Sequence, residues 1–483
     1  MQHRVRVQRR GRTGARRALA ATATAGVCCL SLSVMAGTPA LAQTGPVSST
    51  PAIGTPTLAP TGTTEQIRQL VDCGGTMFAV GTFSAIDWNG TTYARTNVFS
   101  FADTSPFTIT TWAPNVNGEV NSIAFNNGNC ADAYIGGQFT SVNGTTVANI
   151  AEIDTTAGNV VTGFGSHAGG GHVDTILWVP GGANGHLLVG GTFTSINGNK
   201  GANAYYASLD PLTGKDDGFL HLSVSGHIVF PKVKTNSTEV YNQQLSNPPG
   251  NTLLLVEGDF TSVGGQNRRQ IFMLNVGGTS ATLTGWSSPE FDGSNPTAYP
   301  YFNCAASHPF YIHAAAWSPD NSEVYIADTG FHPYNWNGTT FPIPGLCDDA
   351  AAFPATQTEV THDWINHDGC DSLYSAAADS FAVYVAGHNR WFDNPDACNA
   401  KGPGAIPAPG LAGLNPAGPT DANLITNTAG TAGLYSRSRG HGADDMLLTS
   451  AGLWIASDNF GGGIQCGGVS GYSGICFLQY PTT

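Results

Sequence analysis

The sequence predicts an all-β fold built from seven copies of one strand-rich unit. Each copy contains a run rich in Val, Ile and Leu that ends at an aromatic residue and a Gly-containing turn, as is typical of β-strands. Apolar residues almost nowhere recur with the 3.6-residue period of a helix. The aromatic residues that close the seven runs are Phe83, Phe139, Phe193, Phe260, Phe331, Trp391 and Phe460.

The length of the unit indicates how the copies are arranged. The closing aromatic residues stand 54 to 71 residues apart, which leaves room for four short strands in each copy. A shorter strand precedes the main run, as in VDTILWV at residues 173–179, and another follows it, as in YYASLDPLTG at residues 205–214. Repeats of this length favour the blades of a β-propeller over a solenoid, whose coils are shorter. We therefore predict a single seven-bladed β-propeller with four-stranded blades at residues 63–483.

The N-terminal segment at residues 43–62 is predicted to close the ring. The seventh copy ends after GICFLQY at residues 474–480 and is one strand short. Residues 53–61 precede the first copy and are placed to supply the missing outer strand. Closure of this kind removes sheet edges that would otherwise promote aggregation.

Two stretches of the sequence resemble known repeats. The pattern VGGTFTSING at residues 189–198, followed by ASLDPLTG at residues 207–214, resembles the delta-60 type β-propeller repeats of secreted bacterial proteins. The stretch RGHGADDMLLTSAGLWIASDNF at residues 439–460 resembles exported actinobacterial propellers. The repeat resemblance covers residues 65–290 well and the rest loosely. It implies an exported propeller and no particular activity.

Residues 1–42 are predicted to be a secretory signal peptide. They contain seven arginines and no acidic residue, then an apolar Ala-rich run, and they end in Ala-Leu-Ala before Gln43. The pair Arg16–Arg17 makes the twin-arginine pathway an alternative to the general one. No later apolar run approaches the roughly 20 residues that a membrane span needs. We therefore expect a secreted, extracellular protein, cleaved after Ala42 and without a membrane span.

The charge balance narrows the class of partner. Without the seven arginines of the expected signal peptide, the chain has 12 basic and 33 acidic residues and a net charge near −21. Such a surface repels phosphate backbones, which excludes nucleic acid as the expected partner. Divalent cations and neutral polymers are compatible with it.

Eight cysteines follow residue 42, and an even number in an exported protein predicts disulfide bonds. The sequence does not fix their pairing, but the short separations favour Cys370–Cys398 and Cys466–Cys476. Cys73 and Cys130 fall at equivalent points of the first two copies. Equivalent atoms of adjacent blades are expected to lie farther apart than the ~5.5 Å between Cα atoms that a disulfide prefers, which disfavours this pair.

One polar residue recurs at an aligned position of the inner strands, and the inner strands of a propeller surround its axis. The aligned residues are Glu65, Asn121, Asp174, His313, Asp371 and Asp444, with no residue assigned in the fourth copy. Carboxylates in such a ring repel one another unless a hard cation or ordered water compensates them. We therefore interpret Glu65, Asp174, Asp371 and Asp444 as candidate ligands of Ca²⁺ in the central channel, with a hydrated polar ring as the alternative. No other cofactor is indicated.

The stretch THDWINHDGCDS at residues 361–372 concentrates histidines and aspartates. A His–Asp pair at one face of a propeller can act as a general base and its orienting acid. Capping of loop backbone is the competing structural role. No G-x-S-x-G nucleophile motif occurs. The candidate catalytic residues are Asp363, His367, Asp371, His441 and Asp444.

Two matching loops, DWNGTT and NWNGTT, carry Trp88 and Trp336. Tryptophan beside Asn and Asp is suited to stacking on sugar rings, although a Trp can also cover the rim between blades. Histidines at strand ends gather on one face of a propeller and add to this set. The candidate ligand-binding residues are Trp88, Trp336, His172, His388 and Arg390.

These observations predict an extracellular binding module, acting as a monomer, for a glycan or another cell-surface component such as a surface protein. The alternative is a hydrolase or lyase that acts on a polysaccharide through the loop Asp and His residues, with or without Ca²⁺. A third hypothesis is a quinoprotein-like oxidoreductase, suggested by the turn at residues 207–214. The sequence leaves open whether the protein is an enzyme.

Overall fold

β-Strands dominate the computed structural model of the chain, and all described residues belong to the unit Ala42–Thr483. The single helical element among them is a 3₁₀ turn, η1 (Pro289–Phe291). No helix in this part of the chain is long and apolar enough to cross a membrane. The structure describes residues 43–126, 128–201, 203–229, 237–291, 304, 308–330, 346–395, 397–398, 400–418, 443–459, 464–466 and 469–481.

Seven antiparallel sheets of three or four strands follow one another along the described residues. Within each sheet the strands are ordered as they are in the chain. The sheets are β2 (Gln66–Cys73), β3 (Thr76–Thr82) and β6 (Val98–Ala102); β7 (Glu119–Asn126), β8 (Asn129–Gln138) and β11 (Ile150–Asp154); β13 (Val173–Val179), β14 (His186–Gly191) and β17 (Tyr206–Leu209); β19 (Glu239–Leu245), β20 (Leu253–Asp259), β23 (Ile271–Asn275) and β24 (Thr282–Leu283); β25 (Tyr311–Trp317), β26 (Glu323–Thr329), β27 (Asp349–Pro354) and β28 (Trp364–His367); β29 (Leu373–Ala378), β30 (Val383–Gly387) and β33 (Leu411–Leu414); and β34 (Ala443–Thr449), β35 (Gly452–Ser457) and β38 (Ile475–Gln479).

Smaller sheets form in the connections between these strands. They are β1 (Thr57–Leu58), β4 (Ala85–Trp88) and β5 (Thr91–Ala94); β9 (Ser141–Val142) and β10 (Thr145–Thr146); β12 (Ala168–Gly169), β15 (Ser195–Ile196) and β16 (Asn199–Lys200); β18 (Val224–Ser225), β21 (Ser262–Val263) and β22 (Gln266–Asn267); β31 (Trp391–Phe392) and β32 (Ile406–Pro407); and β36 (Ile464–Cys466) and β37 (Val469–Tyr472).

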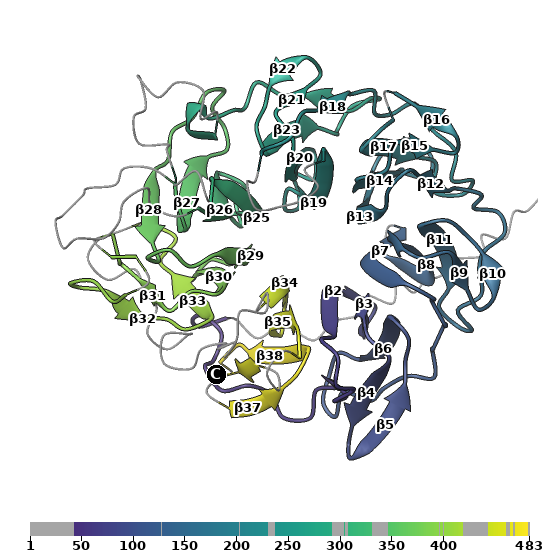
Figure 1. Ribbon diagram of the computed structural model, residues 1–483, viewed down its shortest axis with the longest axis horizontal. Helices are drawn as coiled ribbons and strands as arrows, with labels where there is room; N and C mark the ends of the chain where they lie inside the picture. Colours follow the sequence, from purple (N-terminus) through teal and green to yellow (C-terminus); the bar gives the residue numbers. More distant parts are fainter. Residues whose placement is uncertain are drawn as a thin grey trace, which may run out of the picture. The chain divides into compact units, whose positions relative to one another are not determined.

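The seven larger sheets surround a common centre, and the first strand of each lies nearest to it (Figure 1). Each first strand contacts the first strand of the next sheet, and β34 contacts β2. This radial arrangement is a β-propeller, so the predicted all-β propeller fold is confirmed.

The N-terminal segment lies along the last strand of the chain. The backbone N–H groups of Ser48 and Ala52 donate to the carbonyls of Gln479 (2.7 Å) and Phe477 (2.8 Å), and Pro51 forms an isolated bridge with Leu478. Residues 48–52 thus pair with β38 of the seventh sheet, whereas Thr57–Leu58 (β1), within the predicted residues 53–61, pairs with β4 (Ala85–Trp88) instead.

The second strand of each sheet contains a continuous apolar run because neighbouring sheets cover both of its faces. In β14, for example, every residue from Leu187 to Gly191 is buried. Strands covered on both faces lose the alternation of polar and apolar residues that one-sided strands show. This burial explains the repeated runs such as LLVGG in the sequence.

Each first strand contains a β-bulge at the same position, where one residue is skipped in its pairing with the second strand. In five sheets a glycine of the second strand pairs with the residue just before the bulge. A Cβ atom on any of these glycines would lie 2.0–2.2 Å from the backbone oxygen of the residue two positions before the bulged one, well inside van der Waals contact. In these five sheets the close approach of the two strands at the bulge therefore leaves room only for glycine. The five glycines are Gly81, Gly137, Gly191, Gly258 and Gly387.

Four disulfide bonds join cysteines of the described residues. The two local pairs, Cys370–Cys398 and Cys466–Cys476, are those that the sequence favours, and Cys304–Cys347 is a third. Cys73–Cys130 is also bonded, with its Cα atoms 5.7 Å apart, so the expectation against this pair is wrong. The reason is that the two positions are not equivalent: Cys73 ends the first strand of its sheet, whereas Cys130 lies on the second strand of the next.

We expect Gly191→Ala to lower the free energy of unfolding by about 1–3 kcal/mol, the usual range for an overpacked core. The new methyl group would meet the carbonyl oxygen of His172 at 2.2 Å. Chemical denaturation measures the change. Gly165→Ala is the matched control, because a Cβ there meets no atom within 4 Å. Equal stability of both variants would contradict the role of the glycine.

Candidate functional site

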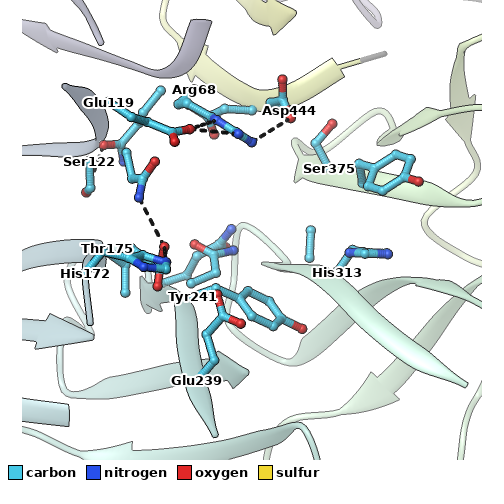
Figure 2. Close-up of a pocket in the computed structure, with 18 of the residues that line it drawn as sticks. Arg68, Glu119, Ser122, His172, Thr175, Glu239, Tyr241, His313, Ser375 and Asp444 are labelled. Carbon is cyan, nitrogen blue, oxygen red and sulfur yellow. Dashed lines mark hydrogen bonds and ion pairs between the residues drawn. The ribbon is translucent and has the colours of Figure 1, made fainter. Parts of the chain in front are cut away.

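A pocket of about 450 Å³ lies at the centre of the propeller and is lined by the first strands of all seven sheets (Figure 2). Every bulged residue lines it, because a bulge adds one residue and turns the side chain out of the regular pleat. One backbone feature, repeated seven times, therefore builds the pocket. The bulged residues are Arg68, Asn121, Asp174, Tyr241, His313, Tyr374 and Asp444.

One side of the pocket is charged. The Arg68 guanidinium contacts Glu119 Oε1 through Nε (2.9 Å) and Nη2 (2.8 Å), and its Nη1 lies 3.8 Å from Asp444 Oδ1. Gln66 donates from Nε2 to the other oxygen of Asp444. Arg68 thus bridges carboxylates of the second and the seventh sheets across the first (Figure 2).

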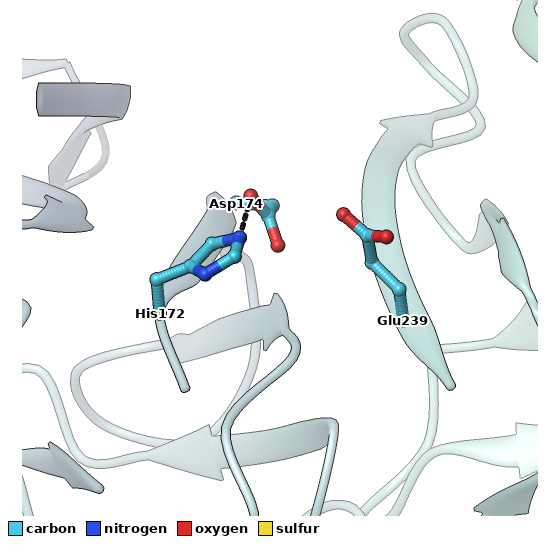
Figure 3. Close-up of side chains that lie close together, drawn as sticks. All are labelled: His172, Asp174 and Glu239. Atoms are coloured by element: carbon cyan, nitrogen blue, oxygen red, sulfur yellow. Dashed lines mark ion pairs between the residues drawn. The ribbon is translucent and has the colours of Figure 1, made fainter. Parts of the chain in front are cut away.

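Next to this group, His172, Asp174 and Glu239 face one another (Figure 3). His172 Nε2 lies 3.1 Å from Asp174 Oδ1, which also accepts a hydrogen bond from Asn121 Nδ2 at 3.1 Å. The other ring nitrogen of His172 lies 3.0 Å from Thr192 Oγ1. One donor atom from each of His172, Asp174 and Glu239 lies within 4.8 Å of the other two, and no other trio of His, Cys, Asp or Glu in the described ranges meets this criterion.

The proximity of these groups changes their protonation. Burial raises the pKa of Asp174, although the hydrogen bond with His172 opposes this. Burial, and next the charge of Asp174, raise the pKa of Glu239 to about 8. The hydrogen bond with Asp174 raises the pKa of His172. At neutral pH, therefore, the two carboxyl groups retain a proton between them.

The opposite side of the pocket is aromatic. The ring of His313 lies 4.6 Å from that of Tyr374 and 4.9 Å from that of Tyr311, centroid to centroid. Tyr241 and His388 extend this arc at 5.6 Å from Tyr311 and 5.1 Å from Tyr374. The arc therefore crosses the fourth, fifth and sixth sheets, opposite the carboxylates.

The sequence alignment identified part of this ring. Asn121, Asp174, His313 and Asp444, which the alignment placed in one column, all occupy the bulge position. Glu65 and Asp371 do not, because the strand pairing places Arg68 and Tyr374 there. In most first strands an apolar residue lies one position before the bulge and another lies two positions after it. These two apolar residues are three positions apart. An alignment shifted by three residues therefore still matches apolar with apolar, and this shift occurred in the first and sixth copies.

Glu65 and Asp371 lie outside the residues that line the pocket, so two of the four predicted Ca²⁺ ligands are elsewhere. Glu65 Oε1 accepts hydrogen bonds from the backbone N–H (3.0 Å) and the hydroxyl (2.8 Å) of Ser84. Asp371 accepts two hydrogen bonds of 2.7 Å from the Arg390 guanidinium. Both carboxylates therefore stabilise loops around the pocket.

The histidines and aspartates of residues 361–372 do not form one cluster with the pocket. Asp363 is exposed before β28, and His367 ends that strand with Nδ1 2.5 Å from Asp349 Oδ1. Of the other predicted catalytic residues, Asp444 lines the pocket and His441 lies outside the described residues.

The predicted ligand-binding residues are also dispersed. His172 lines the pocket and His388 packs against the ring of Tyr374, which lines it. Trp88 is on the outer strand β4, where Nε1 donates to the carbonyl of Pro106 at 3.2 Å. Arg390, besides holding Asp371, stacks on the ring of Trp391 at 4.5 Å. Trp336 lies outside the described residues.

The sequence reading missed several pocket residues, among them Glu119, Glu239 and Tyr241. A signal for them exists: the segments EVN (119–121), HVD (172–174) and EVY (239–241) share one pattern of polar, Val and bulged residue. Matching these three segments would have placed the fourth copy in register.

A second group of acidic residues is buried away from the pocket. Asp328, Asp348, Asp349 and Asp368 are all fully buried, and one carboxylate oxygen of Asp328, of Asp348 and of Asp368 has no hydrogen-bond partner. Burial, followed by repulsion from Asp349 and Asp348, raises the pKa of Asp328. Asp328 occupies the position where five other sheets have glycine, since it pairs with Ile312 before the bulge.

Asp328→Asn is expected to raise the melting temperature by several degrees at pH 7 and by much less at pH 4. The folded-state pKa of Asp328 lies above the unfolded value, so the free energy of unfolding falls as pH rises above about 4, and the amide removes this loss. Thermal melts of both proteins across this pH range measure it.

Asp320→Asn is the control with the opposite sign. Asp320 is exposed, and hydrogen bonds from Ser322 and Ser318 lower its pKa to about 2. Its stabilisation is present above about pH 4 and is lost as pH falls, so the amide should not stabilise at pH 7. A lower melting temperature of Asp328→Asn at pH 7 would show that the buried charge is compensated.

Comparison with known proteins adds fold-level similarity only. No family model matches the sequence, and no curated protein matches it. The structure is similar to the RRP9 WD40 repeats (TM-score 0.45, 10% identity, 89% of this chain and 99% of that one) and to the WD40 β-propeller domain of Doa1 (TM-score 0.43, 9% identity, 88% and 96%). It is also similar to the Dos1 propeller (TM-score 0.42, 10% identity, 86% and 92%).

Proposed function

We propose that this protein is a secreted binding protein whose central pocket recognises the end of a neutral glycan. The observation that carries the proposal is the division of one pocket into an aromatic arc and a carboxylate-rich side. Sugar rings present an apolar face that packs on aromatic rings and hydroxyl groups that donate to carboxylates and amides. Tyr374 and His313 supply the first surface, and Glu119, Asp174 and Asp444 the second.

The size and charge of the pocket support this class of ligand. A volume of about 450 Å³ lies within the roughly 300–1,000 Å³ of small-molecule sites, which suits a chain end better than a polymer that passes through. Five carboxyl groups line the pocket together with one guanidinium, that of Arg68. Such a site disfavours phosphorylated and acidic ligands.

We also propose that the chain is exported and extracellular, acts as a monomer, and belongs with the delta-60 type repeats. Four disulfide bonds support an oxidising compartment. The expected signal peptide, residues 1–42, lies outside the described residues. The partner that carries the glycan can be a polysaccharide or a surface protein.

Tyr374→Ala is expected to weaken binding of a neutral oligosaccharide at least tenfold, about 1.4 kcal/mol, because a stacked ring is lost from the centre of the site. Calorimetric titration of a panel of neutral oligosaccharides measures this, with the melting temperature as a check on folding. Trp88→Ala tests the outer rim instead. Loss of binding in Trp88→Ala but not in Tyr374→Ala would place the site on the rim and contradict the proposal.

A second candidate function is hydrolysis of a polysaccharide. The specific observation is that Glu239, with a pKa of about 8, holds a proton at neutral pH beside Asp174. Cleavage of a glycosidic bond uses one protonated carboxyl group as general acid and a second carboxylate nearby. In this second candidate function the glycosidic bond is cleaved in the central pocket, and not at the loop Asp and His residues that the sequence suggested.

If this second candidate is right, Glu239→Gln should lower turnover at least 100-fold, the usual contribution of a general acid. Release of reducing ends from neutral polysaccharides measures turnover. Glu359→Gln, an exposed carboxylate outside the pocket, should leave it unchanged. Absence of product from every substrate with the wild-type protein would remove the hydrolase hypothesis while leaving the binding proposal intact.

The quinoprotein hypothesis rested on the turn at residues 207–214. In the structure, Asp210 Oδ1 accepts hydrogen bonds from the backbone N–H groups of Leu212 (3.1 Å) and Thr213 (2.8 Å). These bonds give the turn a structural role, as expected for an Asp that begins a turn.

A further inference from the structure

We propose that His172, Asp174 and Glu239 bind a divalent transition-metal ion, with Zn²⁺ as the reference ion, at the charged side of the central pocket. His172 immediately precedes β13, Asp174 is the bulged residue of that strand, and Glu239 begins β19 of the next sheet. The three side chains converge from two sheets on one point (Figure 3).

The distances fit one ion. Ligand atoms at ~2.1 Å from a zinc ion lie at most about 4.2 Å from one another. The three donor atoms already lie within 4.8 Å of one another, so side-chain movements on the order of half an ångström would bring them to bonding distance.

An unpartnered oxygen provides a second and independent observation. Oδ1 of Asp174 has Asn121 and His172 as partners, whereas its buried Oδ2 has no N–H or hydroxyl donor and faces only the carboxyl group of Glu239. A buried carboxylate oxygen without a donor or a cation is costly. Among the described residues, the only ion pair of Asp174 or Glu239 is the one with His172, since Arg68 pairs with Glu119 and Asp444.

The orientation of His172 suits a metal ligand. Thr192 Oγ1 lies 3.0 Å from Nδ1 and also accepts the backbone N–H of His172 at 3.0 Å. This contact holds the ring with Nε2 directed at the carboxylates. Histidine ligands are commonly held in this way, with the second ring nitrogen bonded to an oxygen of the protein.

The donor set selects the class of metal. One imidazole nitrogen with two carboxylates suits Zn²⁺ and related ions, whereas Ca²⁺ takes six to eight oxygen ligands. The Ca²⁺ ring expected from the sequence needs Glu65 and Asp371, and both lie outside the pocket. Three protein ligands also leave at least one coordination position open toward the pocket.

This metal site goes beyond the proposed recognition of a glycan and does not depend on it. Metal binding is measured in the absence of any sugar, so either proposal can fail without the other. Binding of the ion displaces the proton that Asp174 and Glu239 retain between them.

The test is a titration of the tag-free secreted protein with Zn²⁺ at pH 7.5, after dialysis against a chelator, by calorimetry and by elemental analysis of the bound metal. We expect one Zn²⁺ per chain and no comparable binding of Ca²⁺. Asp174→Asn and Glu239→Gln should each lower the affinity at least tenfold. Glu119→Gln, which changes a carboxylate of the same pocket that is held by Arg68, should retain it.

Three results would overturn the proposal. They are no saturable Zn²⁺ binding by the folded wild-type protein, an equal loss in Glu119→Gln and in the ligand variants, or tighter binding of Ca²⁺ than of Zn²⁺. Circular dichroism and thermal melts confirm that each variant is folded. Should Asp174→Asn fail to fold, the variants Glu239→Gln and His172→Gln provide the same test, because both side chains are half-buried.

Discussion

The pocket depends on one backbone feature, the β-bulge in the first strand of each sheet, and in five of the seven sheets a second-strand glycine packs closely against it. In the third sheet, the carbonyl of His172 occupies the space that a Cβ on Gly191 would need. The bulge places one side chain of every sheet in the channel. Because the backbone feature is the same in each sheet, the identity of each channel side chain can vary without changing the scaffold.

In three sheets the side chain of the residue after the bulge accepts a backbone hydrogen bond from the neighbouring sheet. Gln69 Oε1 accepts the backbone N–H of Ile123 at 2.7 Å, and Ser122 Oγ accepts that of Ile176 at 3.0 Å. Asp445, in the seventh sheet, does the same for Leu70 of the first at 3.1 Å. The bulge thus supplies one side chain to the ligand space and the next to the neighbouring sheet, which preorganises the pocket.

The sequence predicted the fold well because the repeat glycine reports on the bulge in five sheets, and repeat aromatic residues such as Phe193 and Phe260 report on the core. It predicted the channel residues Asn121, Asp174, His313 and Asp444 for the same reason. It could not predict the aromatic arc, since a Tyr in a strand such as Tyr374 is equally expected in a core. Partners from different sheets, such as Asp174 and Glu239, become neighbours only when the sheets surround a common centre.

Divergence among the copies gives a nearly symmetric ring an asymmetric site. The charged side comes from sheets that retain the repeat glycine, as with Gly137 and Gly191, and from the seventh sheet, where Ser457 stands in its place. The aromatic arc comes partly from the fifth sheet, where Asp328 replaces that glycine opposite the bulge that carries His313. The excess of acidic over basic residues in the chain repels anions from the channel and raises the local concentration of cations. A neutral ligand on the aromatic side and a cation on the carboxylate side therefore satisfy both halves of the pocket at once, whereas an anionic ligand satisfies neither.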